Sequence, residues 1–320
     1  MLAAKTDAWY LSDIRNSVRQ ENRMTLPTTE MPHPQSSGLD LKQGEEILAI
    51  LWRGQAEAIE AVATALPALA RGGEAMAGAI RAGGNIVYAA AGSSGMMALA
   101  DGLEIPPTFG VSSSRIKVLR AGGFERITIP KEGAEDDIEA ARRDAGVIGP
   151  NDCVICLAAS GNTPYPVEIM AIAKARGAVT VGLANNPGTR LLEGADIAVL
   201  LPTPPEVIAG STRLGAGTAQ KIALNLMSTL MGIRLGHVLD GLMVNVVASN
   251  AKLKWRAEHI VMTVTGCNRT MAADSLARSG GRVKEAALIA RGAAELAAAT
   301  ALLRAADQSL RKALAALPAG

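Results

Sequence analysis

The chain has 320 residues, of which 59 are alanine and only eight are aromatic (three Trp, three Tyr and two Phe). Its 32 basic and 30 acidic residues leave a formal charge of +2, so it has neither the positive charge nor the stacking rings that nucleic-acid binding requires. No run of about 18 uninterrupted apolar residues occurs. We therefore expect no nucleic-acid partner and no membrane span.

Cysteine and histidine usage bears on compartment and on metal binding. The three cysteines are an odd number without a disulfide framework, and the N-terminal stretch is unlike a signal peptide. Cys153 and Cys156 lie three apart on a predicted strand, so they should point to opposite faces. With only three histidines as well, we predict a cytoplasmic protein without a metal site.

Taken in chain order, residues 1–28 show no clear periodicity, and Met24 offers a second candidate start. Residues 41–82 have helical periodicity, with breaks expected near Pro67 and Gly72-Gly73. The region from about residue 265 is nearly all helical in pattern. The chain is thus predicted to contain an N-terminal extension at 1–28, a main domain at 29–264 and a helical C-terminal module at 265–320.

Short apolar runs alternate with helical segments through the main domain. The runs typical of strands are 85–92, 116–123, 152–160, 178–186 and 197–203. The segments with helical patterns are 93–104, 133–146, 163–177, 189–195 and 215–236. This alternation predicts an α/β fold with a five-stranded parallel sheet and helices on both faces.

Three loops in this region are small and rich in hydroxyls: 91–95, 159–164 and 209–213. In an open parallel sheet, ligands bind beyond the carboxyl ends of the strands, where helix N-termini present free N–H groups. No glycine-rich nucleotide motif is present, so we expect a phosphorylated or polyhydroxyl ligand. The candidate binding residues are Gly92, Ser93, Ser94, Ser160, Gly161, Asn162, Thr163, Glu206, Ser211 and Thr212.

Two carboxylates are candidates for general acid–base chemistry. Glu104 precedes Pro106 and Pro107, which we expect to end its helix and to fix the position of the acid. Glu135 lies in an acidic run at the start of a predicted helix, where a carboxylate also stabilises the helix dipole. Spacing alone does not pair them, so helix capping remains an alternative for Glu135.

Many blocks, in a fixed order, extend from Thr29 to the C-terminal module. They include TEMPHPQSSGLDL, AAGSSGMMALADGLEIPPTFGV, EGAEDD, AASGNTPY, NNPGT, EVIAGSTRLGAGTAQK, LMVNVVASNAKL and TGCN. These blocks resemble the signatures of the N-acetylmuramic acid 6-phosphate etherase family. The resemblance implies the sugar-isomerase (SIS) fold, a three-layer α/β sandwich with a five-stranded parallel sheet.

The resemblance also implies a reaction, in amino-sugar catabolism and peptidoglycan recycling. The family cleaves the D-lactyl ether of N-acetylmuramic acid 6-phosphate to N-acetylglucosamine 6-phosphate and D-lactate, with no metal or organic cofactor. The ring-opened sugar loses its C2 proton, lactate leaves from C3, and water then adds. By position, Glu104 matches the acid that protonates the departing lactate, and Glu135 matches the second catalytic glutamate, which serves as the base.

Three positions depart from the family pattern. Met96 and Asn162 stand where the family usually has Arg, and Gly215 stands where it usually has Lys. The expected substrate carries a phosphate and a carboxylate, both of which favour such cations. We therefore expect a divergent member whose ligand has less negative charge or places it elsewhere, with Arg120 and Arg190 as candidate replacements.

The position of Glu104 along its predicted helix bears on the oligomeric state of the protein. A helix starting at Gly95 would place this carboxylate about 14 Å along its axis, at about 1.5 Å per residue, which a hexose phosphate does not bridge comfortably. Either the 160–163 loop holds the phosphate, or Glu104 serves a site shared with a neighbouring subunit. Because related SIS domains are commonly dimeric, we predict a homodimer with shared active sites.

Two other functions remain alternatives: an aldose–ketose sugar-phosphate isomerase, and a non-catalytic sugar-phosphate-binding regulator. Retention of both glutamates favours an enzyme, whereas the loss of three cations favours a changed ligand or lost activity.

Overall fold

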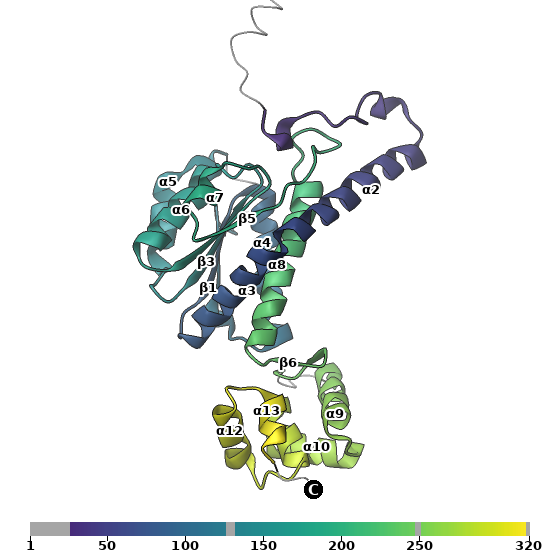
Figure 1. The fold of residues 1–320 in the computed structure, drawn as a ribbon, viewed down its shortest axis with the longest axis vertical. Helices are drawn as coiled ribbons and strands as arrows, with labels where there is room; N and C mark the ends of the chain where they lie inside the picture. Colours follow the sequence, from purple (N-terminus) through teal and green to yellow (C-terminus); the bar gives the residue numbers. More distant parts are fainter. Residues whose placement is uncertain (1–25, 126–131, 247–250, 318–320) are drawn as a thin grey trace, which may run out of the picture.

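A five-stranded parallel sheet forms the centre of the computed structural model, which describes residues 26–125, 132–246 and 251–317 (Figure 1). The strands are β1 (Ile86–Ala90), β2 (Ile116–Arg120), β3 (Cys153–Ala158), β4 (Val179–Ala184) and β5 (Ile197–Leu200). Their spatial order is β2-β1-β3-β4-β5, and Ile86 of β1 pairs with Ile116 on one side and Cys153 on the other. The predicted α/β class and all five predicted strands are confirmed.

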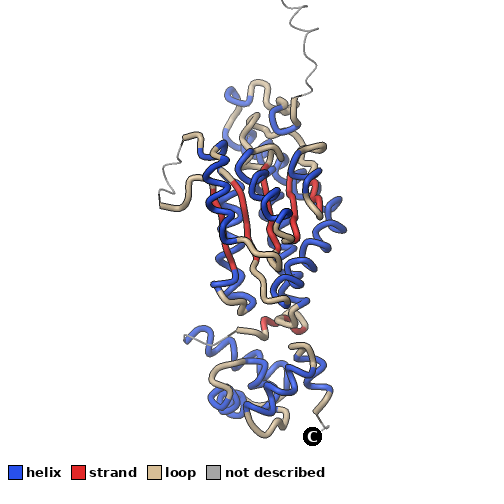
Figure 2. The backbone as a smooth tube through the Cα atoms, turned by 90° about the vertical axis from the view of Figure 1, so that its left-hand side faces the viewer, coloured by secondary structure: helices blue, strands red, loops and turns tan. Residues whose placement is uncertain are grey.

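Helices cover both faces of the sheet (Figure 2). One layer consists of α3 (Leu66–Arg81), α4 (Gly92–Phe109) and α8 (Gly215–Arg234). The other consists of α5 (Ile138–Asp144), α6 (Pro164–Ala175) and α7 (Arg190–Gly194). An N-terminal helix, α2 (Gly44–Ala61), packs along α8 and extends past the sheet (Figure 1).

Each strand supplies side chains to two separate hydrophobic cores, because successive residues alternate between the faces. Cys153 and Cys156 illustrate this: the first lies in the core under α3, α4 and α8, and the second in the core under α5 and α6. Burial raises the pKa of Cys153 to about 12 and raises the pKa of Cys156 as well. Both thiols are therefore protonated near neutral pH, which does not suit redox or metal chemistry.

The expected helix end before the Pro-Pro pair is wrong. α4 runs through Pro106 and Pro107 to Phe109, although each proline removes one backbone hydrogen bond from the helix. A proline φ is itself compatible with a helix, and burial of Ile105 and Phe109 holds this turn against the core. The helix ends where Gly110 adopts a left-handed φ of 65° and donates its N–H to the Pro106 carbonyl at 2.9 Å.

The expected break at Gly72-Gly73 is also wrong, because both residues lie inside α3, which begins just before Pro67. The two glycines face α8. A Cβ on Gly72 would come within 2.5 Å of Met227 Sδ, and one on Gly73 within 2.9 Å of Leu230 Cδ2. The glycines therefore serve close packing of two helices.

The predicted helix over 133–146 is shorter in the structure. Turns of 3-10 helix occupy Ala134–Asp136 and Ala145–Val147, and only α5 between them is α-helical. The cause is an N-cap inside the predicted segment: the Asp137 carboxylate accepts the backbone N–H of Ala140 at 2.8 Å.

The C-terminal region forms its own helical module at one end of the sheet (Figure 1). It contains the hairpin β6 (Val238–Leu239) and β7 (Leu242–Met243), then α9 (Ala251–Thr265), α10 (Arg269–Arg278), α11 (Val283–Ala290), α12 (Leu296–Ala305) and α13 (Leu310–Ala315). Its hydrophobic core begins at Val244 and includes Ile260 and Val261 of α9. The boundary at residue 265 remains a prediction, and most of the predicted 1–28 extension lies outside the described residues.

No helix in the part of the chain that the structure describes combines the length and the apolar composition that crossing a membrane requires.

Candidate active site

The three hydroxyl-rich loops lie at one edge of the sheet, the edge formed by the carboxyl ends of the parallel strands. The loop at 91–95 joins β1 to α4, the loop at 159–164 joins β3 to α6, and the segment at 209–213 leads from β5 into α8. This shared edge is where a parallel α/β sheet binds ligands. The C-terminal module lies at the opposite end of the sheet (Figure 1).

The loop after β3 is a tight turn that ends in a helix N-terminus. Gly161 has a left-handed φ of 73°, and a Cβ there would collide with the Thr189 side chain. The hydroxyls of Ser160 and Thr163 are 3.2 Å apart, and the Asn162 side chain accepts the backbone N–H of Arg190 at 3.0 Å. Asn162 thus ties the loops after β3 and β4 together. The hydroxyls and the first N–H groups of α6 suit an oxyanion.

The loop after β1 leads directly into the 18-residue helix α4. Gly92 has a φ of 53°, Ser94 is buried and Ser93 is half-buried. No side chain caps this helix start. Its first N–H groups are therefore available for an anionic ligand.

The third group of predicted binding residues has a different arrangement. Glu206 is only 5% exposed, and its two carboxylate oxygens accept the backbone N–H groups of Gly215 at 2.9 Å and Ala216 at 2.8 Å. It therefore caps α8, and its binding role remains a prediction. Ser211 and Thr212 are half-buried in the preceding turn.

Buried polar atoms without partners also gather at this edge. Among the described residues, four buried side-chain atoms lack a hydrogen-bond partner: Arg120 Nε, Thr189 Oγ1, Gln220 Oε1 and His237 Nδ1. Arg120 ends β2, Thr189 lies in the loop after β4, and Gln220 bonds Asn185 at the end of β4 at 3.0 Å. Unsatisfied buried groups are rare in native proteins. Three of the four lie along the carboxyl edge of the sheet, the same edge as the hydroxyl-rich loops.

One chain does not bring Glu104 and Glu135 together. Both are exposed. Glu104 lies far along α4, two residues after Gly102, whose Cβ would pack 3.3 Å from Ile116 at the amino end of β2. Glu135 follows the carboxyl end of β2, in a turn that packs on α6 in the other helix layer. The two carboxylates thus belong to opposite layers and to opposite ends of β2.

The uncharged residues at the expected cation positions differ in their surroundings. Met96 is half-buried in the first turn of α4, and Gly215 packs tightly, since a Cβ there would lie 3.1 Å from Ala58 Cβ and 3.2 Å from Glu206 Oε2. Of the candidate replacements, Arg190 is exposed at the start of α7. Arg120, by contrast, is 7% exposed and lies at the carboxyl edge.

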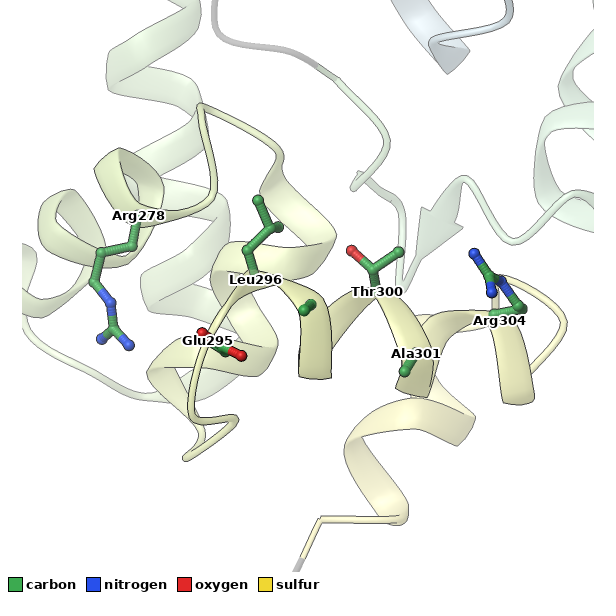
Figure 3. A pocket seen from close by; sticks show the side chains of 7 residues that line it. Arg278, Glu295, Leu296, Thr300, Ala301 and Arg304 are labelled. Carbon is green, nitrogen blue, oxygen red and sulfur yellow. The ribbon is translucent and has the colours of Figure 1, made fainter.

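The structure also contains a groove of about 760 Å³ in the C-terminal module (Figure 3). Arg278 and Arg304 stand at its two ends, with Glu295, Leu296 and Thr300 between them. None of the predicted site residues lines it. Within residues 26–125, 132–246 and 251–317, no three His, Cys, Asp or Glu side chains gather as a metal site would need.

Comparison with known proteins identifies the family. The SIS domain model matches residues 124–230. The N-acetylmuramic acid 6-phosphate etherase of Deinococcus radiodurans is 46% identical over 82% of this chain and 87% of its own. The etherases of Rubrobacter xylanophilus and Streptomyces avermitilis are 42% and 41% identical, covering 83% and 91% of this chain and 89% and 94% of theirs. The chain belongs to the N-acetylmuramic acid 6-phosphate etherase family. The predicted family and the predicted SIS fold are thereby confirmed.

Two polar residues that join segments at the carboxyl edge, Thr29 and Asn186, were not predicted as site residues. Thr29 exchanges hydrogen bonds with the Asn186 side chain at 3.3 and 3.0 Å, and the Asn186 amide also donates to the Ala159 carbonyl at 3.2 Å. These bonds dock the segment before α2 onto the loops after β3 and β4. Thr29 and Asn186 both lie in blocks that carry the family resemblance, which was the available signal.

Proposed function

We propose that this chain cleaves the D-lactyl ether of N-acetylmuramic acid 6-phosphate, or of a closely related sugar, to N-acetylglucosamine 6-phosphate and D-lactate. The observation that carries the proposal is its 46% identity to an etherase over most of both chains. Glu104 and Glu135 lie in sequence blocks that resemble this family. The hydroxyl-rich loops at the carboxyl edge support a sugar phosphate as the ligand. The reaction would belong to the cytoplasmic recycling of amino sugars.

The proposed chemistry is an elimination followed by a hydration. In the open-chain sugar, the aldehyde acidifies the C2 proton, which Glu135 removes as general base. The bond between C3 and the ether oxygen then breaks, and Glu104 gives its proton to the departing lactate oxygen. Water adds across the new double bond, its oxygen to C3 and a proton to C2. Every step uses groups of the chain, the substrate and water.

For this reaction we propose a homodimer in which each site takes one glutamate from each chain. The separation of Glu104 from Glu135 within one chain supports this arrangement. Exposed apolar side chains support it too: Leu48 is 66% exposed, Trp52 69% and Leu103 64%. Leu103 neighbours Glu104, so a second copy that covers Leu103 would come to lie next to that carboxylate.

The first test is release of D-lactate from N-acetylmuramic acid 6-phosphate, measured with D-lactate dehydrogenase. Glu104→Gln and Glu135→Gln should each lower kcat about 10²- to 10⁴-fold, the range for loss of a general acid or base. Glu132→Gln is the matched control, because Glu132 is an exposed glutamate three residues from Glu135. In ¹⁸O water the label should enter the sugar and not the lactate. No lactate from the wild-type protein would contradict the proposed function.

Subunit mixing tests the shared site. In a heterodimer of Glu104→Gln and Glu135→Gln chains, one site carries both substitutions and the other carries neither. Random exchange should therefore restore about a quarter of wild-type activity, because about half the dimers are mixed and each has one intact site. A mixture as inactive as its components would show that each chain builds its own site.

A further inference from the structure

Arg120 is a buried cation without a counter-charge. Its side chain is 7% exposed, and no carboxylate of the described residues lies within ion-pair distance of it. Among the described residues, its guanidinium makes one hydrogen bond, from Nη1 to the Gly123 carbonyl at 2.7 Å, and its buried Nε has no partner. Burying a charge without a partner is strongly unfavourable, because the lost hydration is not replaced. Such an arginine calls for an anion that the described residues do not supply.

The fold holds this side chain against the binding loop after β1. Arg120 pairs with Ala90 at the ends of β2 and β1, and its aliphatic part crosses the first turn of α4. Gly95 makes room for it: a Cβ there would lie 3.0 Å from Arg120 Cγ, 3.2 Å from Cδ and 3.5 Å from Nε. On the other side, the Phe124 ring centroid is 6.0 Å from the guanidinium carbon.

We propose that Arg120 binds the carboxylate of the lactyl group, and so makes the enzyme specific for substrates that carry this carboxylate. The inference rests on the proposed function and adds the residue that recognises the leaving group. Arginine suits the role because its planar guanidinium presents paired N–H donors that match a carboxylate. The free Nε of Arg120 is one such donor. The neighbouring Met96 brings no charge of its own.

The order of the strands separates the two anions of the substrate. The loop at 160–163 follows β3, whereas Arg120 ends β2, and β1 lies between them. Two strand spacings at about 4.8 Å each place these positions about 10 Å apart. This suits a sugar with a phosphate on C6 and the lactyl acid on C3. The uncharged β3 loop, with its hydroxyls and helix N–H groups, suits the phosphate, which leaves Arg120 for the carboxylate.

The test compares Arg120→Met with the wild-type protein in two measurements. The KM for N-acetylmuramic acid 6-phosphate, followed by D-lactate release, should rise about 10- to 150-fold, the usual loss for a hydrogen bond to a charged group. The inhibition constant of N-acetylglucosamine 6-phosphate, which has the phosphate but no lactyl group, should change less than about threefold. Arg120→Lys keeps the positive charge but lacks the planar guanidinium, so it should raise KM by a smaller factor. It replaces Arg120→Met in the test if the methionine variant does not fold.

Arg115→Met is the matched control. Arg115 lies at the other end of β2, and its guanidinium also bonds a loop carbonyl, that of Gly84 at 3.0 Å, so its loss should leave both constants unchanged. Equal weakening of both ligands by Arg120→Met would assign Arg120 to the phosphate and overturn the inference, as would no effect on either. A wild-type protein without lactate release would instead refute the proposed function, and this inference with it.

Discussion

Replacing Glu206 with glutamine should destabilise the protein, because this carboxylate caps α8. Both of its oxygens accept backbone N–H groups, at 2.9 and 2.8 Å, and the side chain is 5% exposed. Glutamine keeps one acceptor and turns an NH₂ group toward the other N–H. One lost charge-assisted bond costs about 1.5–3 kcal/mol, and the lost interaction with the helix dipole about 0.3–1 kcal/mol. The expected loss is thus about 2–4 kcal/mol.

Thermal unfolding followed by circular dichroism measures this loss. At about 2–4 °C per kcal/mol for a domain of this size, Tm should fall by roughly 5–15 °C. Glu193→Gln is the control, because Glu193 is exposed on the short helix α7. An unchanged Tm in Glu206→Gln, together with a raised KM, would refute the capping argument and assign the residue to the substrate.

Two further predictions concern other parts of the structure. Gly161→Ala would place a side chain at a φ of about 73°, which is unfavourable for alanine, and would make it collide with Thr189. The substitution should therefore lower stability by about 1–3 kcal/mol and raise KM. Wild-type values of Tm and KM would contradict this. Lys284 is 2% exposed, and burial lowers its pKa from 10.5 to about 8. Between these values the unfolded chain binds more protons, so wild-type stability should rise with pH. Lys284→Met should therefore be more stable than the wild-type protein at pH 7. The gain should be up to about 3 kcal/mol, reduced by the loss of the hydrogen bond to the Gln308 carbonyl. Urea unfolding should show that this difference in stability shrinks by pH 10, and a difference that stays constant with pH would contradict the argument.

The sheet could be predicted from the sequence because its strands are continuous apolar runs. All five residues of β1, for example, are buried. A short continuous apolar run between turn signals is typical of a parallel strand that is covered on both faces. Two of the candidate loops, at 91–95 and 159–164, followed directly, since each adjoins a strand in the chain, and the third, at 209–213, precedes α8. Local propensity failed where tertiary packing decides, as at Pro106, where α4 continues because Ile105 and Phe109 are held in the core.

The relation between distant residues could not be predicted from the sequence. Glu104 and Glu135 are only 31 positions apart in the chain, but a helix running antiparallel to the strands carries one of them away from the edge at which the other lies. The burial of Arg120 was equally hidden. A charged side chain at the end of an apolar run is ordinarily solvated. Arg120 is buried here because Gly95, in the neighbouring helix α4, leaves space for its side chain.

The position of the helical C-terminal module has a practical consequence for handling the protein. Because the module lies at the end of the sheet away from the candidate loops (Figure 1), a fluorophore, affinity tag or sensor surface attached there would leave the proposed substrate approach open. The segment around Thr29 is bonded to the binding edge itself, so an attachment close to it would crowd the entrance. Immobilised binding measurements should therefore anchor the chain through its C-terminal helices.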